Sequence, residues 1–288
     1  GESLMRLGQA EAGFSRIELA ACEGGPTEKL ALARALGRRG RFEDALNVAR
    51  ETISVILDSD IELNSTLARE AFVTEAGLLR RQGSDWEAIN RLGVVLGVLD
   101  HRARQAWQVR ARLLDERGLA NQRLDRTQEA RADLNSSLEL RREHGRSVEI
   151  AQSLVNLIRL ENNERNFDAA EMHAQFLIET LESTAPSDLH ANAWTAVAQL
   201  RLRQGRPVDG RSYALQALRL NEQMGNTSGV AKSLLVLVQC ARESGALEEA
   251  REYAERCLET NEEMSNERGV ELARWQLAKL ERLASDEL

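Results

Sequence analysis

The sequence predicts an all-α protein built from repeated helix pairs. Three observations indicate this fold. Strong helix formers such as Ala, Leu, Glu, Arg and Gln dominate the 288 residues, only 3 prolines interrupt them, and similar stretches recur about every forty residues. Aromatic residues make up 4% of the chain and β-branched residues are scarce, which disfavours strands. The composition therefore argues against a doubly wound sheet and against most nucleotide-binding enzymes.

The internal repeat is clearest near the C-terminal end. Five residues of the stretch 218–237 recur forty residues later in the stretch 258–277: Glu222, Met224, Asn226, Gly229 and Val230 return as Glu262, Met264, Asn266, Gly269 and Val270. The stretch 138–157 aligns with them eighty residues before the first. Agreement over three stretches indicates one structural unit repeated along the chain.

A small residue also follows each predicted turn at a nearly constant spacing. These residues are separated by 43, 42, 40, 40 and 40 positions: Ala45, Ala88, Ala130, Ala170, Gly210 and Ala250. The distance between two packed helices depends on the side chains at their contact, so a small residue early in a helix lets the preceding helix approach closely.

This pattern resembles the tetratricopeptide repeat, in which two antiparallel helices carry small residues near the eighth and twentieth positions. Ala33, Gly118 and Ala198 match the eighth position, and Trp194 matches the large fourth residue. The five alanines among the markers above match the twentieth position, from which Gly210 departs. The period exceeds the usual length of about 34 residues. It resembles the subgroup found in cargo adaptors and bacterial signalling regulators. The resemblance implies a right-handed α-solenoid of antiparallel helix pairs, a superhelix of about 14 helices.

The turns divide the chain into a predicted single solenoid over residues 1–288. A truncated repeat helix within 8–25 precedes six helix pairs, and a capping helix at 267–284 follows them; the pairs span 26–58, 62–99, 101–143, 147–184, 187–225 and 227–265. Ser187 can cap the helix that follows it, and His190 is expected to be exposed in the turn between two repeats. The chain begins with Gly1, so we expect a fragment of a larger protein.

In this family the first helix of each pair lines a concave surface, and the resemblance implies a peptide-binding groove there. Basic and amide residues dominate its predicted members: Arg34, Arg80, Arg112, Asn156, Arg159, Asn163, Asn192, Gln199, Arg203, Lys232, Gln239, Arg242, Trp275 and Lys279. The same positions also include further basic, acidic and apolar residues, among them Arg38, Arg81, Val73, Glu70, Asp115, Glu116 and Glu243. Basic residues outnumber acidic ones in this set, although the whole chain carries a net charge of −8.

Such a groove suits an extended or helical acidic segment of a protein partner. Amide side chains can both donate and accept hydrogen bonds along a peptide backbone, and arginine binds carboxylates through two N–H groups. The contacts are charge-assisted, so we expect binding to weaken with salt, and Arg159→Glu or Asn156→Ala to reduce it.

Other interpretations stay open at this stage. The charged side chains could simply be solvated on exposed helices, and Trp275 could pack against the preceding pair rather than anchor a partner. The chain could be a sensory or regulatory module of a multidomain signalling protein, such as a kinase, an NTPase-type regulator or a protease. It could also be a self-assembly platform that forms homo-oligomers through the solenoid ends.

No pattern of a catalytic, cofactor or metal site is present, and the sequence therefore predicts a protein that is not an enzyme. The histidines lack zinc-ligand spacing, Cys22, Cys240 and Cys257 fit neither a metal nor a disulfide pattern, and no phosphate-binding glycine motif occurs. The acidic charge argues against nucleic acid as a partner. Apolar stretches such as 92–99 are too short to cross a membrane, so we expect a cytoplasmic protein.

Overall fold

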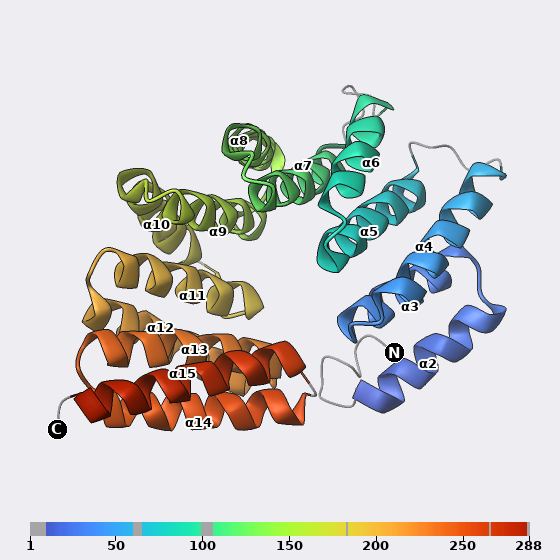
Figure 1. Ribbon diagram of the computed structural model, residues 1–288. Coiled ribbons are helices and arrows are strands. Elements are labelled where there is room, and N and C mark those ends of the chain that lie inside the picture. Colours follow the sequence, from blue (N-terminus) through green and yellow to red (C-terminus); the bar gives the residue numbers. More distant parts are fainter. Residues whose placement is uncertain (1–9, 60–64, 99–105, 183, 265, 287–288) are drawn as a thin grey trace. The chain divides into compact units, whose positions relative to one another are not determined.

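The computed structural model describes residues 10–59, 65–98, 106–182, 184–264 and 266–286, which form fourteen α-helices (Figure 1). This confirms the predicted all-α fold and the predicted number of helices. In chain order they are α2 (Ala10–Glu23), α3 (Pro26–Arg38), α4 (Phe42–Leu57), α5 (Thr66–Gln82), α6 (Asp85–Val98), α7 (Ala106–Arg123), α8 (Thr127–His144), α9 (Ser147–Asn163), α10 (Phe167–Glu182), α11 (Asp188–Arg203), α12 (Pro207–Gln223), α13 (Thr227–Glu243), α14 (Leu247–Glu263) and α15 (Glu267–Asp286).

The chain divides into two compact units, Gly1–Asn156 and Leu157–Leu288. In the N-terminal unit α3 packs on α4, α5 on α6 and α7 on α8, and the first helices α3, α5 and α7 also contact one another in sequence. The C-terminal unit repeats this arrangement, with α11 on α12, α13 on α14, and contacts from α11 to α13 and from α13 to α15. We call α3, α5 and α7 in one unit, and α11, α13 and α15 in the other, the first-helix layer of that unit.

Tight turns join the two helices of a pair. Between α11 and α12 the backbone of Gly205 has a φ of 74°, and the N–H of Arg206 donates to the carbonyl of Arg201 at 2.9 Å. Pro207 then begins α12, where a missing N–H costs nothing. Asp125 and Arg165 occupy the corresponding place in two other pairs with φ values of 56° and 59°, a region that glycine adopts more easily.

The small residues predicted at the helix crossings are buried. Ala45, Ala88, Ala130, Ala170 and Ala250 are all 0% exposed, which confirms the close helix approach that the spacing predicted. Gly210 is the one residue of this set that is not alanine, and its place in the packing explains why. A Cβ atom on Gly210 would lie 2.9 Å from the carbonyl oxygen of Ala198 and 3.2 Å from the sulfur of Cys240, so glycine fits there and alanine is crowded.

The repeated Asn and Gly residues form a hydrogen-bonded latch between α12 and α13. The side-chain nitrogen of Asn221 donates to the carbonyl of Ala217 at 2.9 Å, and its oxygen accepts a hydrogen bond from Asn226 at 2.8 Å. The side-chain oxygen of Asn226 accepts from the N–H of Gly229 at 3.0 Å and thereby caps α13. Asn221 is 2% exposed, so these bonds satisfy an otherwise costly buried amide.

The same latch recurs forty residues later between α14 and α15. Asn266 donates to Asn261 at 2.7 Å, Asn261 donates to the carbonyl of Cys257 at 2.7 Å, and Gly269 donates to Asn266 at 3.3 Å. A Cβ atom on Gly269 would overlap the side-chain oxygen of Asn261. The forty-residue repeat in the sequence therefore reflects one set of contacts that occurs twice along the chain.

One local prediction is wrong. His190 is 7% exposed and lies inside the first turn of α11, where its ring makes hydrogen bonds with Thr184 at 3.2 Å and Ser187 at 3.1 Å. Ser187 is the residue before α11, but its hydroxyl contacts the ring of His190 and makes no capping bond to the helix backbone. The first residues expected in the pairs 62–99 and 101–143 lie outside the described residues.

The latch makes Gly229→Ala a destabilising substitution. The added methyl group would displace the side chain of Asn221 and leave buried polar atoms without partners, which should cost about 2 kcal/mol. Urea unfolding followed by circular dichroism measures this difference. Gly93→Ala in α6 is the control, because no atom lies within 4 Å of the added Cβ, and it should stabilise by about 0.5 kcal/mol. Equal effects of the two substitutions would contradict the latch.

Candidate functional site

A hollow of about 240 Å³ opens on the first-helix layer of the N-terminal unit. Most of its lining consists of positions assigned to the groove from the sequence: Arg34, Arg38, Val73, Arg81, Arg112 and Glu116, joined by Thr74, Gly77 and Leu78. Helices α3, α5 and α7 all contribute, so in this unit the structure gathers groove residues from three successive repeats around one depression.

Ion pairs connect the three helices across this surface. Arg34 contacts one carboxylate oxygen of Glu70 at 2.6 Å, and Arg112 binds the other oxygen of the same carboxylate. Arg80 contacts Glu116 at 2.7 Å. Arg34, Arg80 and Arg112 are thus paired across repeats. These pairs are partly exposed and contribute little stability, so a carboxylate from a partner can replace the internal one at small cost.

The remaining charges of this surface leave it positive. Arg81 on α5 is exposed and makes no ion pair with any described residue. Asp115 is 7% exposed and contacts Arg141 at 2.7 Å, so its charge is neutralised below the surface. Burial raises the pKa of Asp115, and the nearby guanidinium of Arg141 opposes that shift.

In the C-terminal unit, three amide side chains of the first-helix layer form no hydrogen bond with another described residue. Gln199 on α11 and Gln239 on α13 occupy equivalent positions forty residues apart, and both are half-buried. Neither these two nor the exposed Asn192 makes a hydrogen bond to any part of the chain that the structure describes. Their donors and acceptors therefore face outward, available to a peptide backbone.

The other predicted groove residues differ in accessibility. Arg203 donates to the carbonyl of Asn162 at 3.0 Å, and Arg242 to the side chain of Gln276 at 3.2 Å. Lys232 and Asn163 are exposed, whereas Asn156 is 4% exposed and presents little surface. Arg159 is half-buried, burial lowers the pKa of its guanidinium, and no carboxylate among the described residues pairs with it.

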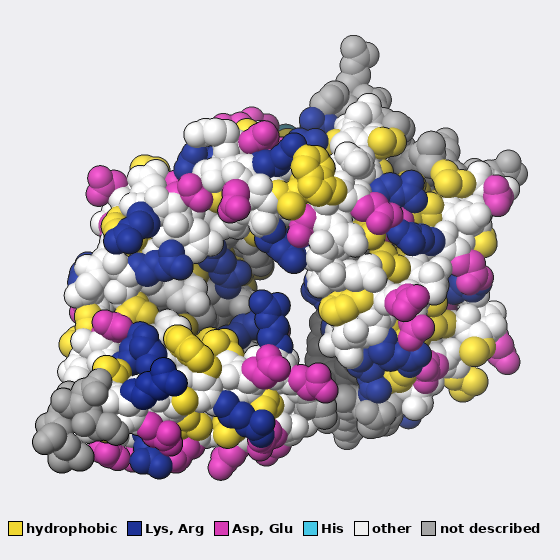
Figure 2. Space-filling view, viewed as in Figure 1, with side chains coloured by type: hydrophobic (Ala, Val, Ile, Leu, Met, Phe, Trp, Pro, Cys, Tyr) yellow, Lys and Arg dark blue, Asp and Glu magenta, His cyan; other side chains and the backbone are white. Residues whose placement is uncertain are grey.

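Trp275 on α15 is the largest apolar side chain that this surface exposes. It is 56% exposed, and the ammonium of Lys279 lies 5.3 Å from the centre of its ring. Figure 2 shows positive side chains beside a hydrophobic patch on the visible face of the C-terminal unit, with negative side chains gathered along the edge at α14. Exposed apolar groups rimmed by charge are typical of interaction surfaces.

An ion pair between a buried arginine and a partly exposed glutamate connects α11 to α10 in this unit. Arg201 is 6% exposed and binds both carboxylate oxygens of Glu171, one of them at 2.9 Å. The guanidinium holds the pKa of Glu171 below its usual range. The pair connects α10 to the helix that carries Asn192 and Gln199.

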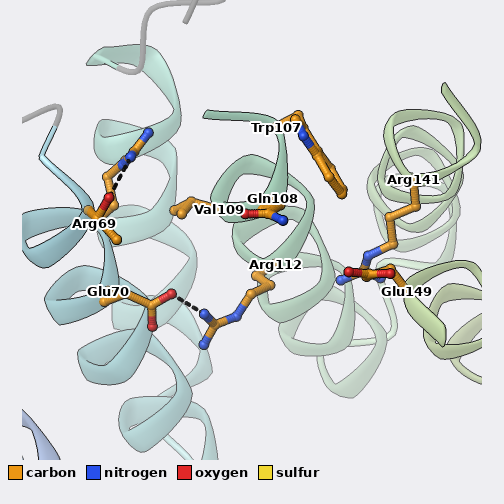
Figure 3. A pocket seen from close by; sticks show the side chains of 9 residues that line it. Arg69, Glu70, Trp107, Gln108, Val109, Arg112, Arg141 and Glu149 are labelled. Carbon is orange, nitrogen blue, oxygen red and sulfur yellow. Dashed lines mark hydrogen bonds and ion pairs between the residues drawn. The ribbon is translucent and has the colours of Figure 1, made fainter. Parts of the chain in front are cut away.

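A second and larger pocket lies in the N-terminal unit and was missed by the sequence reasoning. Its volume is about 430 Å³, and its lining consists of Thr66, Arg69, Glu70, Trp107, Gln108, Val109, Arg112, Arg141 and Glu149 (Figure 3). Only Glu70 and Arg112 were groove positions. The others lie in first turns or at the end of a second helix, where the repeat pattern gives no groove signal.

Among the described residues, no group of three or more His, Cys, Asp or Glu side chains is placed to hold a metal ion. Within the same residues, no helix combines the length and the apolar character needed to cross a bilayer.

The fold and this surface define a helical-repeat protein whose first helices form an interaction layer. Residues 189–263 match the tetratricopeptide repeat family, which covers most of α11 to α14. The resemblance found in the sequence is confirmed over these residues. No curated protein sequence matches the chain.

Solved structures share the fold. A Rap protein complexed with Competence and Sporulation Factor is 11% identical with a TM-score of 0.64, over 94% of this chain and 80% of that one. The apo form of RapI is 12% identical with a TM-score of 0.60, over 91% and 99%. A signal transduction ATPase with a tetratricopeptide repeat sensor from Pyrococcus horikoshii is 17% identical with a TM-score of 0.60, over 93% and 43%. Such low identities establish the fold alone.

Glu171→Gln should reduce the sensitivity of the protein to acid. Because the pKa of Glu171 is lowered in the folded state, the bond to Arg201 stabilises fully above the unfolded pKa of about 4. That stabilisation is lost as the pH falls through the lower, folded pKa. The difference in free energy of unfolding between neutral and acidic pH, measured in urea, should be smaller in the variant than in the wild type.

Glu179→Gln is the matched control for this prediction, because Glu179 is exposed on the same helix and forms no ion pair with a described residue. It should keep the difference seen in the wild type. If both variants lose the same amount of stability on acidification, the Arg201–Glu171 bond does not set the acid response.

Proposed function

We propose that this chain is a non-catalytic scaffold whose first-helix layers bind an acidic segment of a protein partner. The observation that carries the proposal is the hollow on α3, α5 and α7, lined by positive side chains from three successive repeats. A depression of this kind, open to solvent and built from parallel-running helices, accepts a peptide segment more readily than a small substrate.

The arginines of the N-terminal unit support an acidic partner. Glu70 and Glu116 keep Arg34, Arg80 and Arg112 extended at the surface, which lowers the entropy cost of binding a carboxylate. Arg81 adds a charge that no described residue neutralises. A peptide bearing Asp or Glu can therefore exchange its own carboxylates for the internal ones while retaining the guanidinium geometry.

The amides of the C-terminal unit support recognition of the peptide backbone. Gln199 and Gln239 repeat at the same helix position and leave their hydrogen-bonding groups free toward solvent. An amide side chain offers one acceptor and two donors, so it can bind the main chain of a peptide of any sequence. The Rap structure, solved in complex with Competence and Sporulation Factor, supports a binding role for this fold.

Selection of peptides from a random library on the immobilised full chain tests this proposal. Selected peptides should be acidic, and their binding should weaken as salt screens the charges. Arg81→Ser, and separately Gln199→Ala with Gln239→Ala, should each weaken binding about tenfold, because each removes charge-assisted or backbone hydrogen bonds. Fluorescence anisotropy with a labelled selected peptide measures the affinity.

The matched controls lie on α12, a second helix of a pair. Arg219→Ser, and Gln216→Ala with Gln223→Ala, replace exposed residues of the same types and should leave the affinity unchanged. If no peptide is enriched, or if the control variants weaken binding as much as the groove variants, the groove is not the binding surface. Light scattering of the free chain then shows whether the first-helix layer serves self-assembly.

A further inference from the structure

The 430 Å³ pocket of the N-terminal unit carries chemistry that the peptide groove does not require. Three arginines from three helices line it: Arg69 from α5, Arg112 from α7 and Arg141 from α8. Figure 3 shows Glu70 bonded to Arg112 on one side of the pocket, Trp107 along its upper edge, and Arg141 beside Glu149 on the other side. Its volume falls within the range of small-molecule sites.

Arg69 is the unusual member of this set. It is 4% exposed, yet within the described residues its guanidinium bonds two neutral acceptors at the start of α5, the carbonyl of Ser65 and the hydroxyl of Thr66, both at 3.2 Å. No carboxylate of any described residue pairs with it. A buried guanidinium is ordinarily paired, because removing its charge from water is costly.

The carboxylates of the pocket do not supply the missing charge. Glu70 is shared between Arg34 and Arg112, and Glu149 contacts Arg146. Arg141 is neutralised by Asp115. The pocket and the ion pairs that reach it contain five arginines, Arg34, Arg69, Arg112, Arg141 and Arg146, against three carboxylates, Glu70, Asp115 and Glu149. Among the described residues, positive charge therefore exceeds negative charge around the cavity.

Helix direction adds to this potential. The lining residues Thr66 and Arg69, Trp107 to Val109, and Glu149 lie in the first turns of α5, α7 and α9. The N-terminal end of a helix carries a partial positive charge, and three such ends face one cavity. Oxyanions bind favourably at such ends.

The ring of Trp107 supplies an apolar wall. Trp107 is half-buried, and Val109, which is 5% exposed, lines the pocket from the same helix turn. The cavity thus combines arginine side chains with the flat ring of Trp107 in its lining. This combination favours an anion attached to a planar group.

We propose that this pocket binds a small organic anion, a phosphate or carboxylate that replaces Glu70 on Arg112 and is carried by a planar ring that packs against Trp107. The pocket shares Arg112 with the peptide surface, and its test needs no protein partner. The internal carboxylate of Glu70 competes with the ligand for Arg112, so the affinity is set by the exchange of one anion for another.

Calorimetric titration of the full chain with four probes tests the proposal. Phenyl phosphate and benzoate contain both the ring and the anion, inorganic phosphate lacks the ring, and benzamide lacks the charge. Phenyl phosphate or benzoate should bind, and the tighter of the two identifies the oxyanion. Inorganic phosphate should bind at least about fivefold more weakly, and benzamide should not bind, because charge-assisted bonds provide most of the affinity.

Two substitutions and one control make the assignment specific. Arg112→Gln should weaken the tighter probe about tenfold, and Glu70→Gln should strengthen it about threefold, because it removes the competing carboxylate. Arg69→Gln should abolish binding, with circular dichroism showing whether the variant is folded. Arg256→Gln is the control, because Arg256 forms a similarly exposed pair with Glu222 in the other unit, and it should leave the affinity unchanged.

The proposal is overturned if none of the anions binds, if benzamide binds as tightly as benzoate, or if Arg112→Gln keeps the affinity of the wild type. Because Arg112 is an exposed residue on a helix surface, its replacement preserves the fold, and this last comparison stays informative even if Arg69→Gln does not fold.

Discussion

Close approach of antiparallel helices at one crossing per repeat is the constraint on which this structure depends. Ala45, Ala88, Ala130, Ala170 and Ala250 are completely buried at these crossings. A larger side chain would push the two helices of a pair apart and shift every pair that packs beyond it, because interiors packed at this density cannot absorb extra volume. The layers of first helices, and the hollows between their side chains, exist because this spacing is kept.

Buried polar groups fix how one pair is placed on the next. Asn221 with Asn226, and Asn261 with Asn266, tie the end of a second helix to the start of the following first helix. These bonds are directional, so they specify the angle between successive pairs more sharply than apolar contact can. The position of Gln239 relative to Gln199 therefore depends on the Asn221–Asn226 latch, which lies at the other end of α13 from Gln239.

Charge is distributed according to the same geometry. Stacking of first helices brings Arg34, Glu70 and Arg112 side by side, although they are some forty residues apart in sequence, and the ion pairs between them are a consequence of the repeat. Where the acidic residue is absent, as at Gln199 and Gln239, polar groups are left for a partner. In the pocket beside Trp107 the opposite occurs: Arg69 has no carboxylate partner among the described residues.

The sequence by itself determined the helix pairs, because the spacing of small residues and turns is a local property that recurs too regularly to be accidental. It also predicted a set of groove positions, most of which in the N-terminal unit line the hollow on α3, α5 and α7. It could not reveal that Arg34, Arg80 and Arg112 are paired, that Asn156 is buried, or that His190 is held by Thr184. It also missed the pocket around Arg69. Those features depend on side chains that meet only when successive repeats stack, and the distance between them in space is decided by tertiary packing.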